Sequence, residues 1–578
     1  LNAKDIKVDV LNFNQEEFEP IEELQFPILL NQFAFYMENI EDPKFKIASI
    51  RLYKTVLKQF TDRIKKISVD NNVLENYSIV KNRLLNYMVN DTVSYEEKKQ
   101  LLTDFEIVEN RTDLNRLLKN RSLAENKNNL DQLLDKEEEV RQQITELKQK
   151  QQKEDTLYKQ KLFELEEEIT SINKNIQKEN PSFYQLNTSE FDFDRIKIKP
   201  EDAIVIYSVA EDNLFRNSIT SSEILVTDLG LYAEIENDVN AFIKAVKEID
   251  QSNEFAKLSE KLYDKLLIGL ENYKNIIIKA DRSLLNMPFE MLQKENSYLI
   301  DNTSVSYTKG LFYLTDSLYS NDIVYDNNAT FYAPSYTKFK PRDTEVVIRG
   351  EPYDLKGAKE EVKQLSQLVG GKIYDERSAS KTTFFENSSN TSIIHIAGHA
   401  FLNNEDPDLS YIQFSDYEDN NQLFISELYG LKSNANLAVL SACNTGVGGY
   451  NSGEGLVSLS QAFMYSGIPT TVSSLWSAPD QSTKDIMVSF YEFLSKGLSK
   501  SEALQKAKLE YLNSVDNPKF EHPYYWAGFV IYGSDAPIPL NTPLGFKWYY
   551  WALILIIGLL VVAWIYKSQK AKNSSLKI

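Results

Sequence analysis

The residues best suited to chemistry are a cysteine and a histidine that each follow a short apolar run. The chain holds a single cysteine, Cys443, in the stretch LAVLSACNTGVGG, and His399 stands in TSIIHIAGHA. Such runs predict buried strands, so both residues are expected at strand ends. Reactive groups gather at the carboxyl ends of strands in open α/β sheets, and neighbouring strands lie about 4.8 Å apart. The thiol and the imidazole can therefore reach one substrate carbonyl.

This pair would attack a carbonyl carbon. A free thiol has a pKa of about 8.5 and little thiolate at neutral pH, so the imidazole of His399 would raise the reactive fraction or relay the proton. It would then protonate the leaving amine. The oxyanion needs backbone N–H donors, which the turn NTGVGG after Cys443 is flexible enough to present. The alternative is an inert buried cysteine, which is the commoner role of a lone thiol.

The other histidines and the glycine-rich stretches predict no further chemistry. His395 lies inside an apolar run and is expected to be a core histidine bonded to backbone, while His522 precedes a proline and is expected in a turn. HIAGH departs from the zinc motif H-E-x-x-H, because Ile396 replaces the glutamate. GVGGYNSGEG lacks the G-K-S/T ending of a phosphate loop, and no G-x-S-x-G elbow occurs. We therefore expect neither a metal nor a cofactor.

The composition indicates a globular protein of several structural units with an acidic surface. The 578 residues are 42% hydrophobic and 26% charged, and the chain is too long for one core. A formal net charge of −20 argues against nucleic-acid binding, which needs a basic face. The sequence begins with Leu1 rather than methionine, so we expect a preceding segment, and the lack of a signal peptide is uninformative.

The first 229 residues contain no glycine and predict a nearly all-helical region. Residues 1–125 suggest short amphipathic helices like those of tetratricopeptide repeats, although no clean period of about 34 residues is found. Residues 130–176, within a region at 126–180, keep an alternating three- and four-residue apolar spacing. This predicts a long heptad helix or a helical hairpin, packed against a helix of this or another chain. Asn180-Pro181 is expected to end that region.

From Pro200 onward, short β-rich runs alternate with helical stretches. The runs are AIVIYSV, NIIIKA, ATFYAP, TSIIHIAG, LAVLSA and TTVSSLW. Helical patterns such as GAKEEVKQLSQLV and DIMVSFYEFLSKG stand between several of them. Strands alternating with helices imply an α/β domain, whose mostly parallel sheet is covered by helices on both faces.

A charge-free run near the end of the sequence predicts one transmembrane helix at 547–566. WYYWALILIIGLLVVAWIY extends from Trp548 to Tyr566, and its nineteen residues span about 28 Å, close to the thickness of a bilayer's hydrocarbon layer. Aromatic residues gather at both ends, as at membrane interfaces. The basic tail 567–578 favours a cytoplasmic tail and a catalytic domain on the other side, whereas insertion as a tail anchor would give the opposite orientation.

Several stretches resemble, in order, the signatures of the CHAT family, caspase-like domains commonly found with tetratricopeptide repeats. They are LLNMPFEML, LKGAKEEV, HIAGHA, LSACNTG, GEGLVSLSQAFMYSGIPTTVSSLWSAPD and HPYYWAGFVIYG. The resemblance covers about residues 196–535. It implies a caspase-like α/β domain at 196–536, with a pseudo-caspase half at 196–335 and an active half at 336–536.

The resemblance also implies roles for four residues. His399 and Cys443 would be the catalytic dyad of a cysteine endopeptidase related to caspases and separases, with the backbone N–H groups of Cys443 and Ala400 as oxyanion donors. Caspases have glycine where Ala400 stands, and a positive φ there would strain an alanine. Asp480 resembles the acidic residue that separases place near the pocket for the residue before the cut, which would favour Arg or Lys. The alternative is that Asp480 caps the helix beginning QSTKDIM.

The sequence thus predicts a membrane-anchored cysteine endopeptidase that acts on a protein or peptide substrate. A protein partner is expected to regulate it through the N-terminal helices, and we expect weak activity without that partner. Glu454 and Trp476 match family positions and are interpreted as architectural. The alternative function is a non-catalytic CHAT-fold scaffold, or protein-interaction module.

Overall fold

The computed structural model describes most of the chain. The continuous ranges are 25–64, 71–110, 156–179, 191–249, 253–315, 329–336 and, with short gaps, 355–540. Isolated helical positions are also described between 133 and 147 and between 556 and 565.

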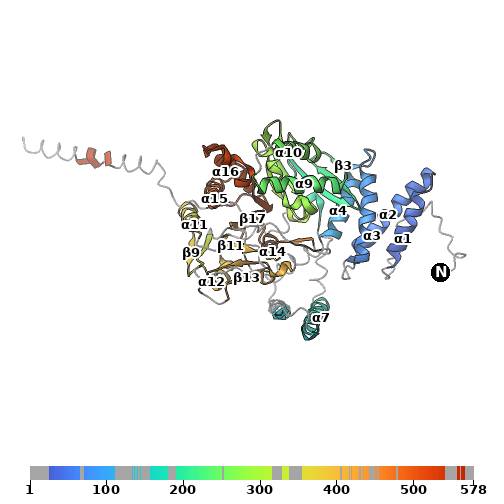
Figure 1. Cartoon of the computed structure of the whole chain (residues 1–578), viewed down its shortest axis with the longest axis horizontal. Helices are drawn as coiled ribbons and strands as arrows, with labels where there is room; N and C mark the ends of the chain where they lie inside the picture. The colour runs from blue at the N-terminus through green and yellow to red at the C-terminus, as the bar shows by residue number, and fades with distance from the viewer. Residues whose placement is uncertain are drawn as a thin grey trace, which may run out of the picture.

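A helical front precedes the sheet. It consists of α1 (Gln25–Glu38), α2 (Pro43–Ile64), α3 (Asn71–Met88) and α4 (Tyr95–Glu109). The helices form because apolar residues recur on one face, as Leu52, Val56 and Phe60 do in α2, and these side chains are buried. Ser94 caps α4 by accepting a hydrogen bond from the backbone N–H of Glu97. Figure 1 shows this front at one end of the molecule, beside the strands that follow it.

Two helical segments of the 126–180 region pack against each other. Helix α7 (Thr156–Glu179) buries Leu165 and Ile172 against Val140, and Ile144 and Ile169 pack around them. The apolar seam is therefore shared between two segments of this chain. Helix α7 ends at Glu179, directly before Asn180-Pro181, and lies apart from the α/β body in Figure 1.

The centre of the molecule is one eleven-stranded sheet, ordered β3-β2-β1-β4-β7-β18-β17-β14-β10-β8-β9. Its strands are β1 (Asp202–Ala210), β2 (Asn213–Ile219), β3 (Ile224–Leu231), β4 (Asn275–Lys279), β7 (Ser304–Tyr307), β8 (Ala329–Pro334), β9 (Lys372–Glu376), β10 (Ile393–Ala397), β14 (Leu437–Ser441), β17 (Thr470–Ser474) and β18 (Phe529–Gly533).

The sheet is mixed and mostly parallel. Antiparallel pairing is confined to β1–β2, β2–β3 and β17–β18 within this sheet of the described residues. All six runs predicted as strands are strands, which confirms the α/β prediction and its mostly parallel sheet. The helical prediction for the whole glycine-free region is wrong beyond residue 201, because β1 and β2 lie there. Glycine scarcity disfavours turns that need positive φ, and it does not select helix over strand.

The strands fall into two sets that meet at the pairing of β7 with β18. Tyr307 of β7 is the register partner of Tyr532 of β18, and those strands run parallel. Strand β8 pairs with β10 and β9, so it belongs with the second set although it precedes residue 335. The division in space therefore falls before β8.

Helices cover both faces of the second set of strands. Successive side chains of its central strands β10 and β14 point to opposite faces of the sheet, and on both faces they are buried. Ile393, Ala397 and Val439 face a core built with helices α11 (Lys356–Val369) and α15 (Asp480–Ser495). Ile396 and Leu440 face an opposite core with α12 (Lys381–Asn387), α13 (Ile425–Leu428) and α14 (Leu459–Tyr465). Burial on both faces explains why these strands read as continuous apolar runs.

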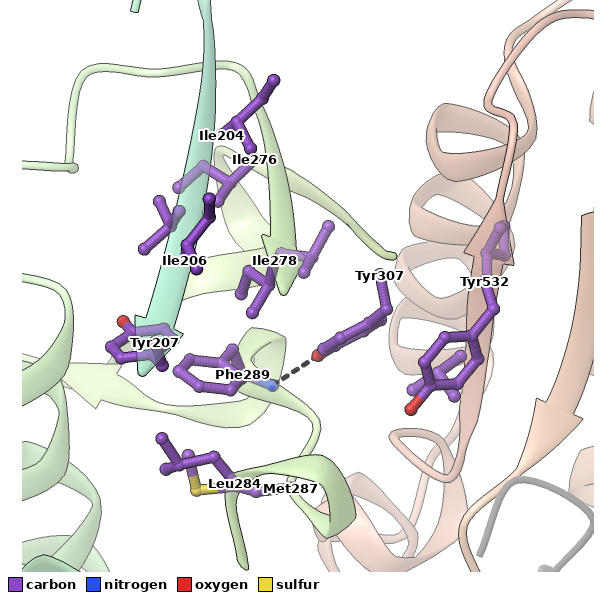
Figure 2. Packing of buried hydrophobic residues seen from close by; sticks show 14 of the residues in the cluster. Ile204, Ile206, Tyr207, Ile276, Ile278, Leu284, Met287, Phe289, Tyr307 and Tyr532 are labelled. Carbon is purple, nitrogen blue, oxygen red and sulfur yellow. Dashed lines mark hydrogen bonds between the residues drawn. The ribbon is translucent and has the colours of Figure 1, made fainter. Parts of the chain in front are cut away.

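The core continues across the junction of the two sets. Helices α9 (Tyr232–Lys247), α10 (Asn253–Leu266) and α16 (Lys500–Ser514) complete its cover. Phe289 lies beside Tyr207 (Figure 2), and their stacked ring centroids are 5.2 Å apart. The backbone N–H of Phe289 donates to the hydroxyl of Tyr307 at 2.8 Å. Tyr307 in turn lies beside Tyr532, so aromatic packing connects the two sets.

Gly533 ends β18 in the left-handed region, with φ +101°. A Cβ at this position would meet the backbone carbonyl oxygen of Pro469, the residue just before β17. The close approach of these two backbones therefore requires glycine.

The predicted membrane segment is described at Ile556, Gly558, Leu559 and 561–565, which are helical, and otherwise lies outside the described residues. Among the residues that the structure describes, no helix combines the length and apolarity needed to span a bilayer.

Candidate functional site at the ends of β10 and β14

The carboxyl ends of β10 and β14 lie side by side. The two strands are parallel neighbours, and Ala397 of β10 is the register partner of Ser441 of β14. His399 follows Ala397 by two residues, and Cys443 follows Ser441 by two. Residues 442–448, which include Cys443, lie outside the described residues. The structure therefore gives no distance between the Cys443 thiol and the His399 imidazole.

His399 begins a short strand that leaves the main sheet. Strand β11 (His399–Phe401) pairs with β12 (Tyr411–Gln413), and β12 pairs with β13 (Gln422–Phe424). His399 is buried, with 4% of its surface exposed. This small sheet fixes where the backbone of His399 lies.

Ala400 is an ordinary strand residue here. It is buried in β11 opposite Ile412 and does not have a positive φ. The strain expected for an alanine in place of the caspase glycine is therefore absent.

Tyr336 is a neighbour of His399 that the sequence analysis missed. Its hydroxyl accepts a hydrogen bond from the backbone N–H of His399 at 3.0 Å and donates one to the carbonyl oxygen of Gln413 at 3.0 Å. Its ring lies 4.6 Å from the imidazole, centroid to centroid. Tyr336 stands two residues after the end of β8, so the rule that found His399 and Cys443 would also have found it.

Gly398, between β10 and β11, leaves room for that hydroxyl. A Cβ at this position would lie 2.7 Å from the hydroxyl oxygen of Tyr336, closer than real Cβ contacts come. Glycine in HIAGHA therefore serves a close approach of side chain to backbone.

His395 is a core histidine, as expected, but its partners are side chains. It is fully buried in β10; its Nε2 lies 2.8 Å from Oε1 of Glu361, and its Nδ1 lies 3.1 Å from the hydroxyl of Tyr491. The prediction of backbone partners is wrong, because the strand's own backbone is occupied by its neighbours β8 and β14. Burial, followed by the nearby Glu361, raises the pKa of Tyr491 well above its ordinary value.

His522 and Trp476 have architectural roles. The Nδ1 atom of His522 accepts a hydrogen bond from the backbone N–H of Tyr524, which confirms the turn prediction. Trp476 is buried, and its indole N–H donates to the carbonyl oxygen of Tyr524 at 2.8 Å. Glu454 lies outside the described residues.

Asp480 is the first residue of α15. The capping position is Pro479, which makes no side-chain cap, so the prediction that Asp480 itself caps the helix is wrong. The side chain of Asp480 lies outside the described residues. Within the ranges that the structure covers, no three His, Cys, Asp or Glu side chains gather as a metal site would require.

A buried polar cluster joins the helical front to the sheet. Nζ of Lys279, at the end of β4, lies 2.8 Å from Oε2 of Glu106 and 3.1 Å from Oε2 of Glu109, both in α4. Burial alone would lower the pKa of Lys279, but the two carboxylates raise it above its ordinary value. Glu106 also accepts from the backbone N–H of Phe312 at 3.4 Å. Sequence spacing could not reveal this cluster, because its members come from three separate segments.

The fold and the paired strand ends define the class: a mixed, mostly parallel α/β protein behind a helical front. Comparison with known families makes the assignment specific, because residues 256–534 match the CHAT domain. The chain therefore contains a CHAT domain, and β1 to β3 extend its sheet beyond the matched residues.

Curated relatives share a short part of the chain. Tetratricopeptide repeat protein 28 of Mus musculus is 34% identical over 122 residues, which are 21% of this chain and 5% of that protein. Its Homo sapiens counterpart is 37% identical over 91 residues, 16% of this chain and 3% of that protein. The chain thus spans about a twentieth or less of these relatives.

Solved structures include a similar chain from the Saccharomyces cerevisiae separase–securin complex. It aligns with a TM-score of 0.46 and 13% identity, over 88% of this chain and 41% of that one. A second crystal structure of the same complex gives a TM-score of 0.45 and 12% identity, over 88% and 40% of the two chains.

Proposed function

We propose that this protein is a cysteine endopeptidase whose CHAT domain hydrolyses peptide bonds with His399 and Cys443. The observation that carries the proposal is the register of Ala397 with Ser441. It brings the ends of β10 and β14 together, and His399 and Cys443 each follow one of these ends by two residues. Ligands and reactive groups collect at such an edge of a parallel sheet. The match of residues 256–534 to the CHAT domain supports the same reading.

In the proposed reaction His399 takes the proton of the Cys443 thiol, and the thiolate attacks the carbonyl carbon of the scissile peptide. Backbone N–H groups of Cys443 and Ala400 stabilise the resulting oxyanion. His399 then gives its proton to the leaving amine, and a thioester remains. Water hydrolyses that thioester with His399 as the base, which restores the thiol.

Three finer properties belong to this proposal. Asp480 favours Arg or Lys before the cut by charge pairing. A regulatory protein binds the N-terminal helices, and a helix at 547–566 holds the protein on a membrane. The described residues of that helix are apolar and mostly more than half exposed, such as Leu559 at 63% and Trp564 at 71%, which suits burial in lipid. Co-sedimentation with lipid vesicles, lost in a chain ending at residue 540, is the check on the anchor.

One observation favours the second candidate, a non-catalytic scaffold. The side chain of His399 is almost entirely covered, whereas a general base must reach its substrate. A scaffold would keep the fold and its buried histidine for binding alone.

Thiol labelling separates the two functions. Cys443 is the chain's single cysteine, so consumption of iodoacetamide reports on it alone. If the protein is a cysteine endopeptidase, we expect iodoacetamide to label Cys443 fast near neutral pH. The labelling rate should fall by about tenfold or more in His399→Ala, because the thiolate loses its partner. His522→Asn is the matched control, since it removes a histidine from a turn and should leave labelling unchanged.

The same samples can be tested on a peptide library. Cleavage that disappears in Cys443→Ala supports the enzyme, and Asp480→Asn is expected to weaken a preference for Arg or Lys before the cut. Slow labelling of Cys443 at the same rate in the wild type and in His399→Ala, with no cleavage of the library, would favour the non-catalytic scaffold.

A further inference from the structure

We propose that Tyr336 is a positioning residue for His399, an inference that rests on the proposed role of His399 as catalytic base. Tyr336 follows β8 by two residues, and β8 is the parallel neighbour of β10, from which His399 emerges. With 4% of its surface exposed, the tyrosine is packed in place. The packing around the sheet therefore fixes the position of the Tyr336 side chain.

The hydroxyl of Tyr336 ties the backbone of His399 to the facing strand. It accepts from the His399 N–H and donates to the Gln413 carbonyl oxygen, both at 3.0 Å. His399 and Gln413 are register partners in β11 and β12, so the hydroxyl bridges the two strands at that pair. A bridge of two hydrogen bonds in a buried setting fixes the point from which the imidazole projects.

The ring of Tyr336 limits rotation of the imidazole. The two ring centroids lie 4.6 Å apart at an interplanar angle of 51°. The ring of Phe401 lies 6.3 Å from the imidazole. Aromatic neighbours at these distances restrict the side-chain rotamers of His399. Backbone and side chain are thus both held, as a base needs for proton transfer at one fixed place.

Gly398 supplies independent support for this geometry. The hydroxyl of Tyr336 occupies the space where a Cβ of residue 398 would be, 2.7 Å away. The next atom in that direction is Cδ of Pro334 at 3.6 Å, an ordinary contact. The hydroxyl and the glycine therefore depend on each other, and the turn before His399 is shaped around Tyr336.

The test measures iodoacetamide labelling of Cys443 against pH in the full chain. Tyr336→Phe keeps the ring and removes the two hydrogen bonds. Tyr207→Phe is the matched control, because the Tyr207 hydroxyl is equally buried and donates to the Leu266 carbonyl at 2.7 Å, away from β10 and β14. Both variants lose a buried hydroxyl, so an effect of stability alone would appear in both.

We expect Tyr336→Phe to move the pH profile of labelling toward that of His399→Ala. Labelling at about pH 6 should fall by about tenfold or more, approaching the hundredfold that a misplaced catalytic group can cost. Peptide cleavage should fall in kcat with KM unchanged, because the hydroxyl does not touch substrate. Tyr207→Phe should keep the wild-type profile.

A second variant pair tests the geometry through stability. Gly398→Ala should lower the melting temperature, because its Cβ would clash with the Tyr336 hydroxyl. Adding Tyr336→Phe should restore much of that loss, since removing the oxygen leaves room for the Cβ. Labelling of the double variant should stay at the slow level of Tyr336→Phe.

The possible failures are distinct. His399-dependent labelling that Tyr336→Phe leaves intact would overturn the positioning role and keep the proposed function. The positioning role would also be contradicted if adding Tyr336→Phe failed to raise the melting temperature of Gly398→Ala. Labelling that does not depend on His399 in the wild type would overturn both proposals.

Discussion

At the scale of residues, Lys508 is a buried cation whose partners are all within the core. Its Nζ donates to Oε1 of Glu290 at 2.8 Å and to the carbonyl oxygen of Phe529 at 2.6 Å, while Oε2 of Glu290 accepts from the hydroxyl of Tyr307 at 2.8 Å. The side chains of Lys508 and Glu290 are 1% and 5% exposed. Burial lowers the pKa of Lys508, and Glu290 opposes that shift.

Lys508→Met is expected to destabilise the protein by about 3–5 kcal/mol, because it leaves the Glu290 carboxylate buried without its cation. Unfolding in guanidinium chloride measures the loss. Adding Glu290→Gln removes the stranded charge and keeps an acceptor for Tyr307, so it should recover part of the stability. A single variant within about 1 kcal/mol of wild type would show that the pair does not hold the core.

The sequence indicates which residues are candidates, but not their partners. His395 is buried as its apolar run predicts, yet its contacts Glu361 and Tyr491 lie 34 and 96 residues away. Tyr336 lies 63 residues before His399. Local spacing defines the face of a strand, whereas the helix or loop that packs on that face depends on the complete fold. The thiol of Cys443 stays a prediction, because it lies outside the described residues.

At the scale of elements, most of the strands found from sequence are buried on both faces, although β4 alternates between buried and half-buried residues. Strands β10 and β14 are continuous apolar runs, so their pattern is visible. Strand β9, KIYDE, is a largely exposed edge strand, so it lacks such a run. Strand β2 is buried but contains Arg216, whose guanidinium donates to the carbonyl oxygen of Leu266 at the end of α10. The bond to Leu266 allows Arg216 to be buried in β2. From sequence alone, a charged residue at this position argues against a buried strand.

The junction of α4 with the sheet predicts an acid-dependent loss of stability. Burial would raise the pKa of Glu109, but Lys81 and Lys279 lower it to about 2. A carboxyl with a lowered folded-state pKa stabilises the fold above its ordinary pKa of 4.5, and that contribution is lost as the pH falls toward 2. We expect Glu109→Gln to be less stable than wild type above about pH 4.5, with the difference shrinking in more acid solution.

Urea unfolding from about pH 6 to pH 3 measures this difference. Glu96→Gln is the control, because Glu96 is a carboxyl of the same helix with a largely exposed side chain. A constant gap between wild type and Glu109→Gln across the range would contradict the assigned pKa.

At the scale of the whole molecule, the helical front is fastened to the first strand set by buried contacts. The side-chain amide of Asn82 donates to the carbonyl oxygen of Ala210 at 2.8 Å, and Nζ of Lys98 donates to that of Ile224 at 3.2 Å. Glu106 reaches Lys279 and the backbone of Phe312. The front is therefore part of the same packed body as the sheet.

If the front restrains the proposed site, a chain lacking residues 1–190 should label at Cys443 faster than the full chain and should cleave more peptide. Lys279→Met should accompany the deletion, because loss of Glu106 and Glu109 would leave the Lys279 ammonium without its carboxylates. The full chain carrying Lys279→Met is the control. Equal rates in all three chains would show that the front does not inhibit.

Gly533 has a consequence for how the sequence can vary. Any side chain there would push against the backbone beside Pro469 and displace the start of β17, which is the parallel neighbour of β14. Saturation mutagenesis at this codon should therefore return glycine almost exclusively among folded clones. A position remote from the paired strand ends would then look, in a screen for activity, as intolerant as the proposed dyad of His399 and Cys443.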